Sequence, residues 1–214
     1  MIEDSYLHKG LRRRLIEQLR SKGIHDQRIL DAMMKIPRHA FIDSSFLKFA
    51  YQDQAFPISS GQTISQPYTV AYQTKLLDIE VFQKVMEVGT GSGYQAAVLA
   101  ELGARVYTIE RIRKLYQQAQ MIHRELGYQV KFFLGDGNLG LPTHAPFDRI
   151  LVTAAAPAIP EALTYQLTIG GILVAPVGDS GIQTMTKCVR TGTDTFEITT
   201  HGGFSFVPMK EGLE

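Results

Sequence analysis

The chain has 214 residues, of which 44% are hydrophobic and 20% are charged, and its formal net charge is +1. This length suits one well-buried domain. The composition is that of neither a disordered chain nor a protein that coats nucleic acid, so we expect no nucleic-acid partner.

The cellular compartment is indicated by the single cysteine and by the N-terminal segment. Cys188 cannot form an internal disulfide, which favours a reducing compartment. The first residues lack the apolar core of a signal peptide, and the most apolar run, 150–159, is too short and too proline-interrupted to span a bilayer. We therefore expect a cytoplasmic monomer with no membrane partner.

The first third of the chain is predicted to be helical. Residues 7–20 are amphipathic, and their apolar stripe is expected to leave Arg12–Arg14 on a solvated face. Asp26 is placed to cap a second helix that Pro37 stops, and Pro67 occupies the first turn of a third helix.

From residue 84 onward the pattern alternates between strands and helices. Strands are predicted at 84–88, 105–110, 130–134, 148–153 and 171–177, and helices at 94–102, 112–126 and 160–167. This alternation is typical of a parallel sheet covered on both faces, and the segments after Gly178 predict antiparallel strands. The expected fold is α/β and Rossmann-like: a doubly wound, mostly parallel sheet with antiparallel C-terminal strands and a helical N-terminal elaboration. We expect one domain over 1–214, divided into a helical part (1–80) and an α/β core (81–214).

Three alternating glycines, Gly89, Gly91 and Gly93, lie between the first parallel strand and its helix. Open α/β sheets bind ligands at the carboxyl ends of their strands. Glycine permits positive φ and close approach of a ligand, and the helix N-terminus offers free N–H groups. A tight turn needs glycine for packing alone, but three in this setting favour a ligand.

The acidic residues around this turn indicate which ligand. Residues 91–96 fit the dinucleotide fingerprint, which is weak by itself. Glu87 would oppose a pyrophosphate but would suit an ammonium group. Glu110 ends the second strand, where it can accept hydrogen bonds from ribose hydroxyls, and Asp136 can accept one from an adenine amino group. This set favours S-adenosylmethionine over NAD and resembles the class I methyltransferases.

A polar loop, 59–66, precedes the glycine turn. The segment 152–157 lacks the Asn/Asp-Pro-Pro-aromatic motif of enzymes that methylate amino groups of bases, which disfavours that acceptor. A carboxylate has a pKa of about 4 and arrives deprotonated, so a site has only to orient it and exclude water. The uncharged side chains of Gln62, Thr63 and Ser65 suit that task.

The sequence also resembles the protein-L-isoaspartate O-methyltransferases over most of its length. The element GQTISQP (61–67) is specific to that family, and further similar segments lie at 23–43, 50–58, 87–100, 135–137, 145–157, 170–178 and 206–209. The resemblance implies methyl transfer from S-adenosylmethionine to the free α-carboxyl of L-isoaspartyl residues in damaged proteins, which begins repair through a succinimide.

The resemblance also implies roles for particular residues. Ser65 matches the active-site serine, to which we assign a positioning role. The simpler alternative is that Ser65 only caps the helix that follows Pro67. The expected substrate-binding residues are Ile58, Gln62, Thr63 and Val207. The expected cofactor-binding residues are Glu87, Gly89, Thr90, Gly91, Ser92, Gly93, Glu110, Arg111, Asp136, Gly137 and Gln183. Ser59 stands where the family usually has glycine, which leaves the conformation of 58–61 open.

Several alternatives remain at this point. A catalytically silent adaptor of the same fold would bind S-adenosylmethionine or damaged peptides without reaction, and an NAD(P)-dependent enzyme would share the glycine turn. Asp53 is predicted to be structural. The six histidines are scattered without metal-ligand spacing, so we expect no metal.

Overall fold

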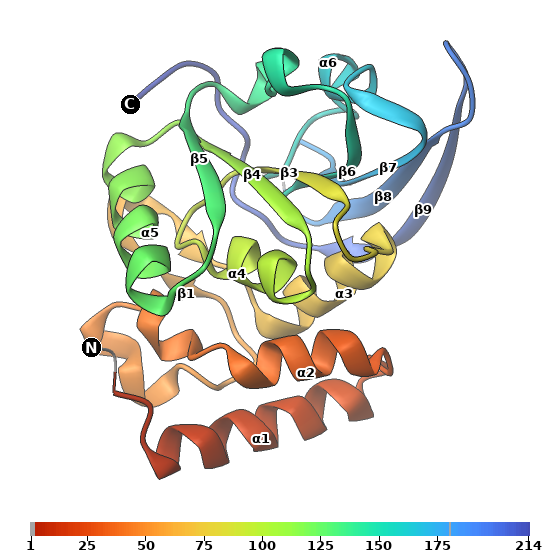
Figure 1. Ribbon diagram of the computed structural model, residues 1–214. Coiled ribbons are helices and arrows are strands. Elements are labelled where there is room, and N and C mark those ends of the chain that lie inside the picture. Colours follow the sequence, from red (N-terminus) through yellow and green to blue (C-terminus); the bar gives the residue numbers. More distant parts are fainter. Residues whose placement is uncertain (1–2, 180) are drawn as a thin grey trace.

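The computed structural model describes residues 3–179 and 181–214, and its centre is one large sheet (Figure 1). In this part of the chain seven strands form the sheet in the order β5-β4-β3-β6-β7-β8-β9. The strands are β3 (Lys84–Val88), β4 (Arg105–Glu110), β5 (Val130–Leu134), β6 (Phe147–Val152), β7 (Leu167–Val177), β8 (Gln183–Arg190) and β9 (Phe196–Phe204). Neighbouring strands from β5 to β7 are parallel to one another. β8 pairs antiparallel with β7, and β9 pairs antiparallel with β8. The predicted fold class is confirmed.

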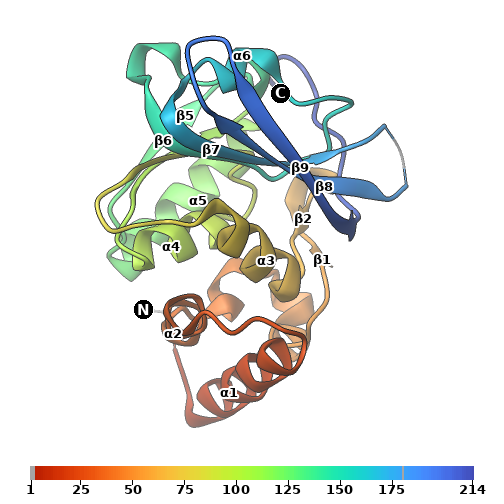
Figure 2. The same ribbon diagram turned by 90° about the vertical axis from the view of Figure 1, so that its right-hand side faces the viewer.

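The two faces of the sheet are covered by different elements (Figures 1 and 2). One face carries α3 (Pro67–Leu77), α4 (Tyr94–Glu101) and α5 (Arg113–Leu126), and the other carries α6 (Glu161–Thr164) with the short 3-10 turns η4 (Gly137–Leu139) and η5 (Pro142–His144). Side chains alternate between the faces, so Val85 packs with Leu99 of α4, whereas Met86 packs with Leu163 of α6.

The N-terminal elements form a layer beneath these helices (Figure 2). They are α1 (Tyr6–Ser21), α2 (Gln27–Lys35), η1 (Arg38–Phe41), η2 (Ser44–Phe49), β1 (Phe56–Pro57), η3 (Ser59–Gly61) and β2 (Thr63–Ile64). β1 and β2 pair as a small antiparallel ribbon, and α2 contacts α3 and α4. A separate hydrophobic cluster includes Leu19, Leu30 and Ile64 and binds this layer to the core. The ribbon thereby carries the polar loop toward the sheet.

Several local predictions differ from the structure, and β7 begins at Leu167 instead of residue 171. Arg12 was predicted to be solvated, but it is 4% exposed and donates to the carbonyl of Ile36 and the hydroxyl of Tyr51, because the buried edge of α1 meets polar groups there. α6 ends at Thr164 and does not reach residue 167. The side chain of Gln166 bonds to backbone groups of the η4 region, and the next residue already pairs within the sheet.

Asp53 fixes the start of α3, as its predicted structural role requires. Its Oδ1 accepts from the backbone N–H of Tyr68 at 2.8 Å, and its Oδ2 lies 2.6 Å from Nζ of Lys22. The N-cap position itself, Gln66, makes no side-chain cap bond among the described residues. The cap of α3 is therefore supplied by Asp53, which leaves Ser65 available for another role. Among the residues described, no helix is both long enough and apolar enough to cross a membrane.

We expect Asp53→Ala to lower the free energy of unfolding by about 1–3 kcal/mol, because it removes the cap and leaves Lys22 without its buried partner. Urea denaturation measures the change. The matched control is Asp43→Ala, which removes an exposed cap of η2 and should cost less than about 1 kcal/mol. Equal losses in the two variants would contradict this interpretation.

Candidate active site

The glycine turn after β3 has a left-handed backbone at each glycine. Gly89, Gly91 and Gly93 have φ values of 96°, 53° and 89°. A Cβ at Gly89 would lie 2.5 Å from Oγ1 of Thr153, and one at Gly93 would lie 2.9 Å from Nε2 of His123. A Cβ at Gly91 would lie 3.9 Å from its nearest described neighbour. Gly91 thus leaves open space beside the backbone, where a ligand can approach.

The carboxylate of Glu110 holds this turn to the neighbouring strand. Its Oε2 accepts from the backbone N–H of Gly91 at 2.8 Å, and its Oε1 accepts from that of Ile112 at 3.0 Å. β3 and β4 are parallel neighbours, so the turn and Glu110 meet at the same edge of the sheet. Glu110 is 5% exposed, and its remaining lone pairs lie at the wall of a pocket.

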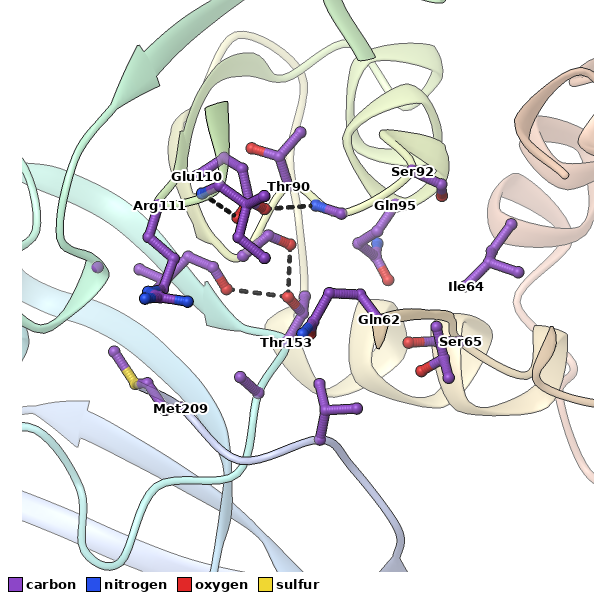
Figure 3. A pocket seen from close by; sticks show the side chains of 18 of the residues that line it. Gln62, Ile64, Ser65, Thr90, Ser92, Gln95, Glu110, Arg111, Thr153 and Met209 are labelled. Atoms are coloured by element: carbon purple, nitrogen blue, oxygen red, sulfur yellow. Dashed lines mark hydrogen bonds between the residues drawn. The ribbon is translucent and has the colours of Figure 1, made fainter. Parts of the chain in front are cut away.

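That pocket has about 870 Å³ of empty space, part of which is open to solvent, and Figure 3 shows the side chains that line it. The polar loop lies on one side and the glycine turn on the other. Eleven of the predicted site residues line it: Gln62, Thr63, Ser65, Gly89, Thr90, Gly91, Ser92, Glu110, Arg111, Gly137 and Val207. The two motifs singled out in the sequence therefore face a single cavity.

Glu87 does not line this pocket, contrary to the expected contact with a ligand's ammonium group. It is fully buried on the sheet face that α3 and α4 cover, and its Oε2 accepts from Oγ1 of Thr108 at 2.5 Å. Thr108 in turn bonds to Thr90 of the glycine turn. Burial raises the pKa of Glu87 to about 8, so the side chain is neutral at pH 7 and supports the turn from beneath.

Asp136 and Gln183 lie beside the pocket and hold the C-terminal segment. Oδ2 of Asp136 accepts from the backbone N–H of Gly212 at 2.7 Å, and Oε1 of Gln183 accepts from that of Phe206 at 2.9 Å. Burial favours a higher pKa for Asp136, but its hydrogen bonds, including those from Gly212 and Asn138, outweigh this and lower the pKa. Neither Asp136 nor Gln183 lines the pocket, and the chain itself supplies these hydrogen-bond partners.

The C-terminal segment itself forms part of the pocket wall, at Val207–Lys210. The backbone of Ala155 donates to the carbonyl of Val207 and accepts from the N–H of Met209. Arg111 donates to the carbonyl of Gly212. Two more predicted residues, Gly93 and Ile58, do not line the pocket. The carbonyl of Gly93 accepts a hydrogen bond from His123, and Ile58 packs against the N-terminal cluster near Gly91.

Several pocket residues were not predicted from the sequence. Thr153, directly after β6, donates from Oγ1 to the carbonyls of Val88 and Gly89 (Figure 3). Its position at the carboxyl end of a strand beside β3 is a signal that could have identified it. Gln95, in the first turn of α4, donates to Oγ1 of Thr74, but its own Oε1 is buried without a partner among the described residues. The remaining lining residues were not predicted or were not assigned a role: Ile64, Val70, Val88, Tyr94, Ile109, Ile112, Ala154, Pro208, Met209 and Lys210.

The donor and acceptor set fits S-adenosylmethionine. Open backbone at Gly91 admits a ligand, and Glu110 offers carboxylate lone pairs to ribose hydroxyls. The unpartnered oxygen of Gln95 is an acceptor that suits an ammonium group. A nucleoside with an amino-acid tail would satisfy all three.

The polar loop owes its shape to two left-handed residues, Ser60 (φ 59°) and Gly61 (φ 64°). Ile58 and Gln62 close it by a backbone hydrogen bond of 2.8 Å. Ser59 donates its hydroxyl to Oε1 of Gln118 on α5. The left-handed positions follow Ser59, so this serine is accommodated without backbone strain and ties the loop to the core.

Asp4, His8 and His39 come together in space, which the histidine spacing did not indicate, with ligand atoms within 4.8 Å of one another. Both ring nitrogens of His39 are already engaged, by the hydroxyl of Tyr51 and the carbonyl of Glu3. Asp4 forms an ion pair with the guanidinium of Arg12 at 2.8 Å. The cluster is therefore a hydrogen-bonded junction at the start of α1.

We expect Glu87→Gln to change the pH dependence of stability. The folded-state pKa of Glu87, about 8, lies above the unfolded value of 4.5, so its stabilising contribution is complete below about pH 4.5 and is lost as the pH rises through 8. The variant carries a permanently neutral side chain and should gain on the wild type by a few degrees in Tm between pH 5 and 9. Thermal unfolding across that range measures the difference, and parallel curves would contradict a buried, proton-binding Glu87.

Comparison with known proteins identifies the family. A family model for protein-L-isoaspartate(D-aspartate) O-methyltransferase (PCMT) matches residues 11–214. The chain is similar to the protein-L-isoaspartate O-methyltransferase of Cytophaga hutchinsonii, with 52% identity over 208 residues that cover 97% of this chain and 94% of that protein. The corresponding protein of Chlorobaculum tepidum is 53% identical over 199 residues, which cover 92% and 93%.

Solved structures agree with the fold. A protein-L-isoaspartate O-methyltransferase structure superimposes with a TM-score of 0.85 at 28% identity, covering 94% of this chain and 67% of the other. A putative protein-L-isoaspartate O-methyltransferase from Plasmodium falciparum, in complex with S-adenosyl-L-homocysteine, gives a TM-score of 0.80 at 23% identity over 95% and 98% of the chains, which bears on the fold alone. This chain belongs to the protein-L-isoaspartate(D-aspartate) O-methyltransferase family.

Proposed function

We propose that this chain methylates the free α-carboxyl of L-isoaspartyl residues in damaged proteins and so initiates their repair through a succinimide. One observation carries the proposal: the uncharged polar loop and the glycine turn line the same cavity. When bound, S-adenosylmethionine supplies an electrophilic methyl group. The protein's task is then to hold a carboxylate in line with that group and to keep water away.

The polar loop is proposed to orient the substrate carboxylate. Ser65 and Thr63 offer hydroxyl donors at the pocket wall, and Gln62 offers an amide. Asp53 caps α3, so Ser65 is free to act on the substrate. Neutral donors bind the carboxylate without an opposing formal charge beside its attacking oxygen, and a carboxylate requires no general base. Val207, on the opposite wall, is proposed to contact the peptide.

The core residues are proposed to hold the methyl donor. Gly89–Gly93 and Glu110 form the wall that its nucleoside and tail would contact, together with Thr90, Ser92, Arg111 and Gly137. We place Glu87, Asp136 and Gln183 in supporting roles, because they bond to the turn and the C-terminal segment. On this basis, 1–80 carries the substrate loop and 81–214 carries the donor site.

The proposed partners are proteins and peptides that contain L-isoaspartyl residues. The near-neutral net charge supports the absence of a nucleic-acid partner. The buried, unpaired Cys188 supports a cytoplasmic location. We propose that the chain acts as a monomer.

The proposal is tested with labelled S-adenosylmethionine and two peptides that differ only in one L-isoaspartyl or normal L-aspartyl residue. We expect base-labile methyl groups on the isoaspartyl peptide alone. Equal labelling of both peptides, or binding of the donor without labelling of either, would contradict the proposed substrate.

A second test concerns the loop. Ser65→Ala should lower kcat/KM for the isoaspartyl peptide by about 10- to 100-fold, because one donor to the carboxylate is lost, and should leave the affinity for S-adenosylhomocysteine unchanged. The control is Ser59→Ala, which alters the same loop at a hydroxyl bonded to Gln118 and should retain activity within about threefold. If the two variants behave alike, Ser65 has no special role.

A further inference from the structure

Arg38 is a fully buried arginine at the start of η1, with an exposed fraction of 0%. A buried charge is costly unless its donors are used. Burial lowers the pKa of Arg38 to about 10, so the guanidinium stays protonated at neutral pH. The fold therefore retains a buried cation at a position where an apolar side chain would carry no desolvation cost.

The guanidinium is held by backbone carbonyls. Its Nε donates to the carbonyl of Ala50 at 3.0 Å. Its Nη2 donates to the carbonyl of Ser65 at 3.1 Å and, more weakly, to that of Gln54 at 3.4 Å. The guanidinium thereby joins η1 to the segment 50–54 and to the end of the polar loop at Ser65.

The same guanidinium also contacts the donor side of the pocket. Its carbon lies 4.8 Å from the centre of the Tyr94 ring, a cation–π distance. Tyr94 begins α4 immediately after the glycine turn, and both Tyr94 and Ser65 line the pocket. Arg38 is thus bonded to the residue that we propose orients the carboxylate and stacked on the helix that follows the donor site.

We propose, on the basis of the function proposed above, that Arg38 is a positioning residue for methyl transfer, which sets the Ser65 backbone relative to the start of α4. Nothing in this role requires Arg38 to touch substrate or donor. Its effect on the reaction passes through the 3.1 Å bond to the Ser65 carbonyl. A lysine can donate to one of these carbonyls but cannot span them with a planar group.

Arg12 provides a matched control within the same layer. It is 4% exposed, donates to the carbonyl of Ile36 and the hydroxyl of Tyr51, pairs with Asp4 at 2.8 Å, and lies 5.8 Å from the Tyr51 ring centre. None of these described contacts lines the pocket. Loss of Arg12 therefore reports the cost of removing a buried arginine without disturbing Ser65.

The kinetic test is a double-mutant cycle. Arg38→Met, Arg38→Lys and Arg12→Met are each assayed with the isoaspartyl peptide, alone and combined with Ser65→Ala. We expect Arg38→Met to lower kcat/KM by about 30-fold or more alone, but several-fold less when Ser65→Ala is already present, since contacting residues are non-additive. Arg38→Lys should show the same pattern with a smaller loss, and it replaces Arg38→Met if that variant does not fold. Arg12→Met should lower activity by the same factor in both backgrounds.

A second measurement is independent of the reaction. Amide hydrogen exchange of residues 58–66 should accelerate by about tenfold or more in Arg38→Met, or in Arg38→Lys if that variant replaces it. The exchange should stay at the wild-type rate in Arg12→Met. If the wild type fails to methylate the isoaspartyl peptide, the proposed function is wrong, and the exchange rates still decide whether Arg38 holds the loop. Unchanged exchange at 58–66, or losses from Arg38 and Ser65 that multiply, would overturn the positioning role.

Discussion

The carboxylate of Glu110 is the interaction on which the donor side of the pocket depends. A turn with several left-handed glycines loses more conformational entropy on folding than an ordinary turn. The carboxylate accepts two charge-assisted hydrogen bonds, from the N–H groups of Gly91 and Ile112, and these bonds offset that loss. The bond from Gly91 joins the ends of the parallel strands β3 and β4.

The acceptor side depends on a different layer of the molecule. The loop around Ser65 belongs to a small ribbon that packs with the N-terminal helices and with α3 and α4. Buried polar side chains, Asp53 and Arg38, hold it to the start of α3 and of α4. Methyl transfer therefore requires the polar loop and the glycine turn, which belong to different layers, to be held in a fixed relative position. Buried hydrogen bonds fix that position, whereas apolar packing alone would allow the loop to shift.

Much of the sheet could be predicted because its strands are short apolar runs separated by clear helical periods; β3, β4 and β5 begin and end as expected. Ser65 and the glycine turn were found because each is a local motif. The depth of Glu87 was missed, although strand alternation places it on the same face as Val85, which helices cover. The partner of Asp136, Gly212, lies 76 residues away and has no local signal. Arg12 shows the same limit, since periodicity locates a helix face but not the polar groups that it will meet.

The central claim is that the turn held by Glu110 is the binding site for the methyl donor, and calorimetric titration of S-adenosylhomocysteine into Glu110→Gln tests it most directly. The amide keeps the shape of the side chain but places an NH₂ where a carboxylate oxygen accepts from the backbone. The account predicts a loss of affinity of about tenfold or more in a protein that remains folded by circular dichroism. An unchanged affinity would contradict it, because the donor would then bind without the turn that Glu110 holds in place.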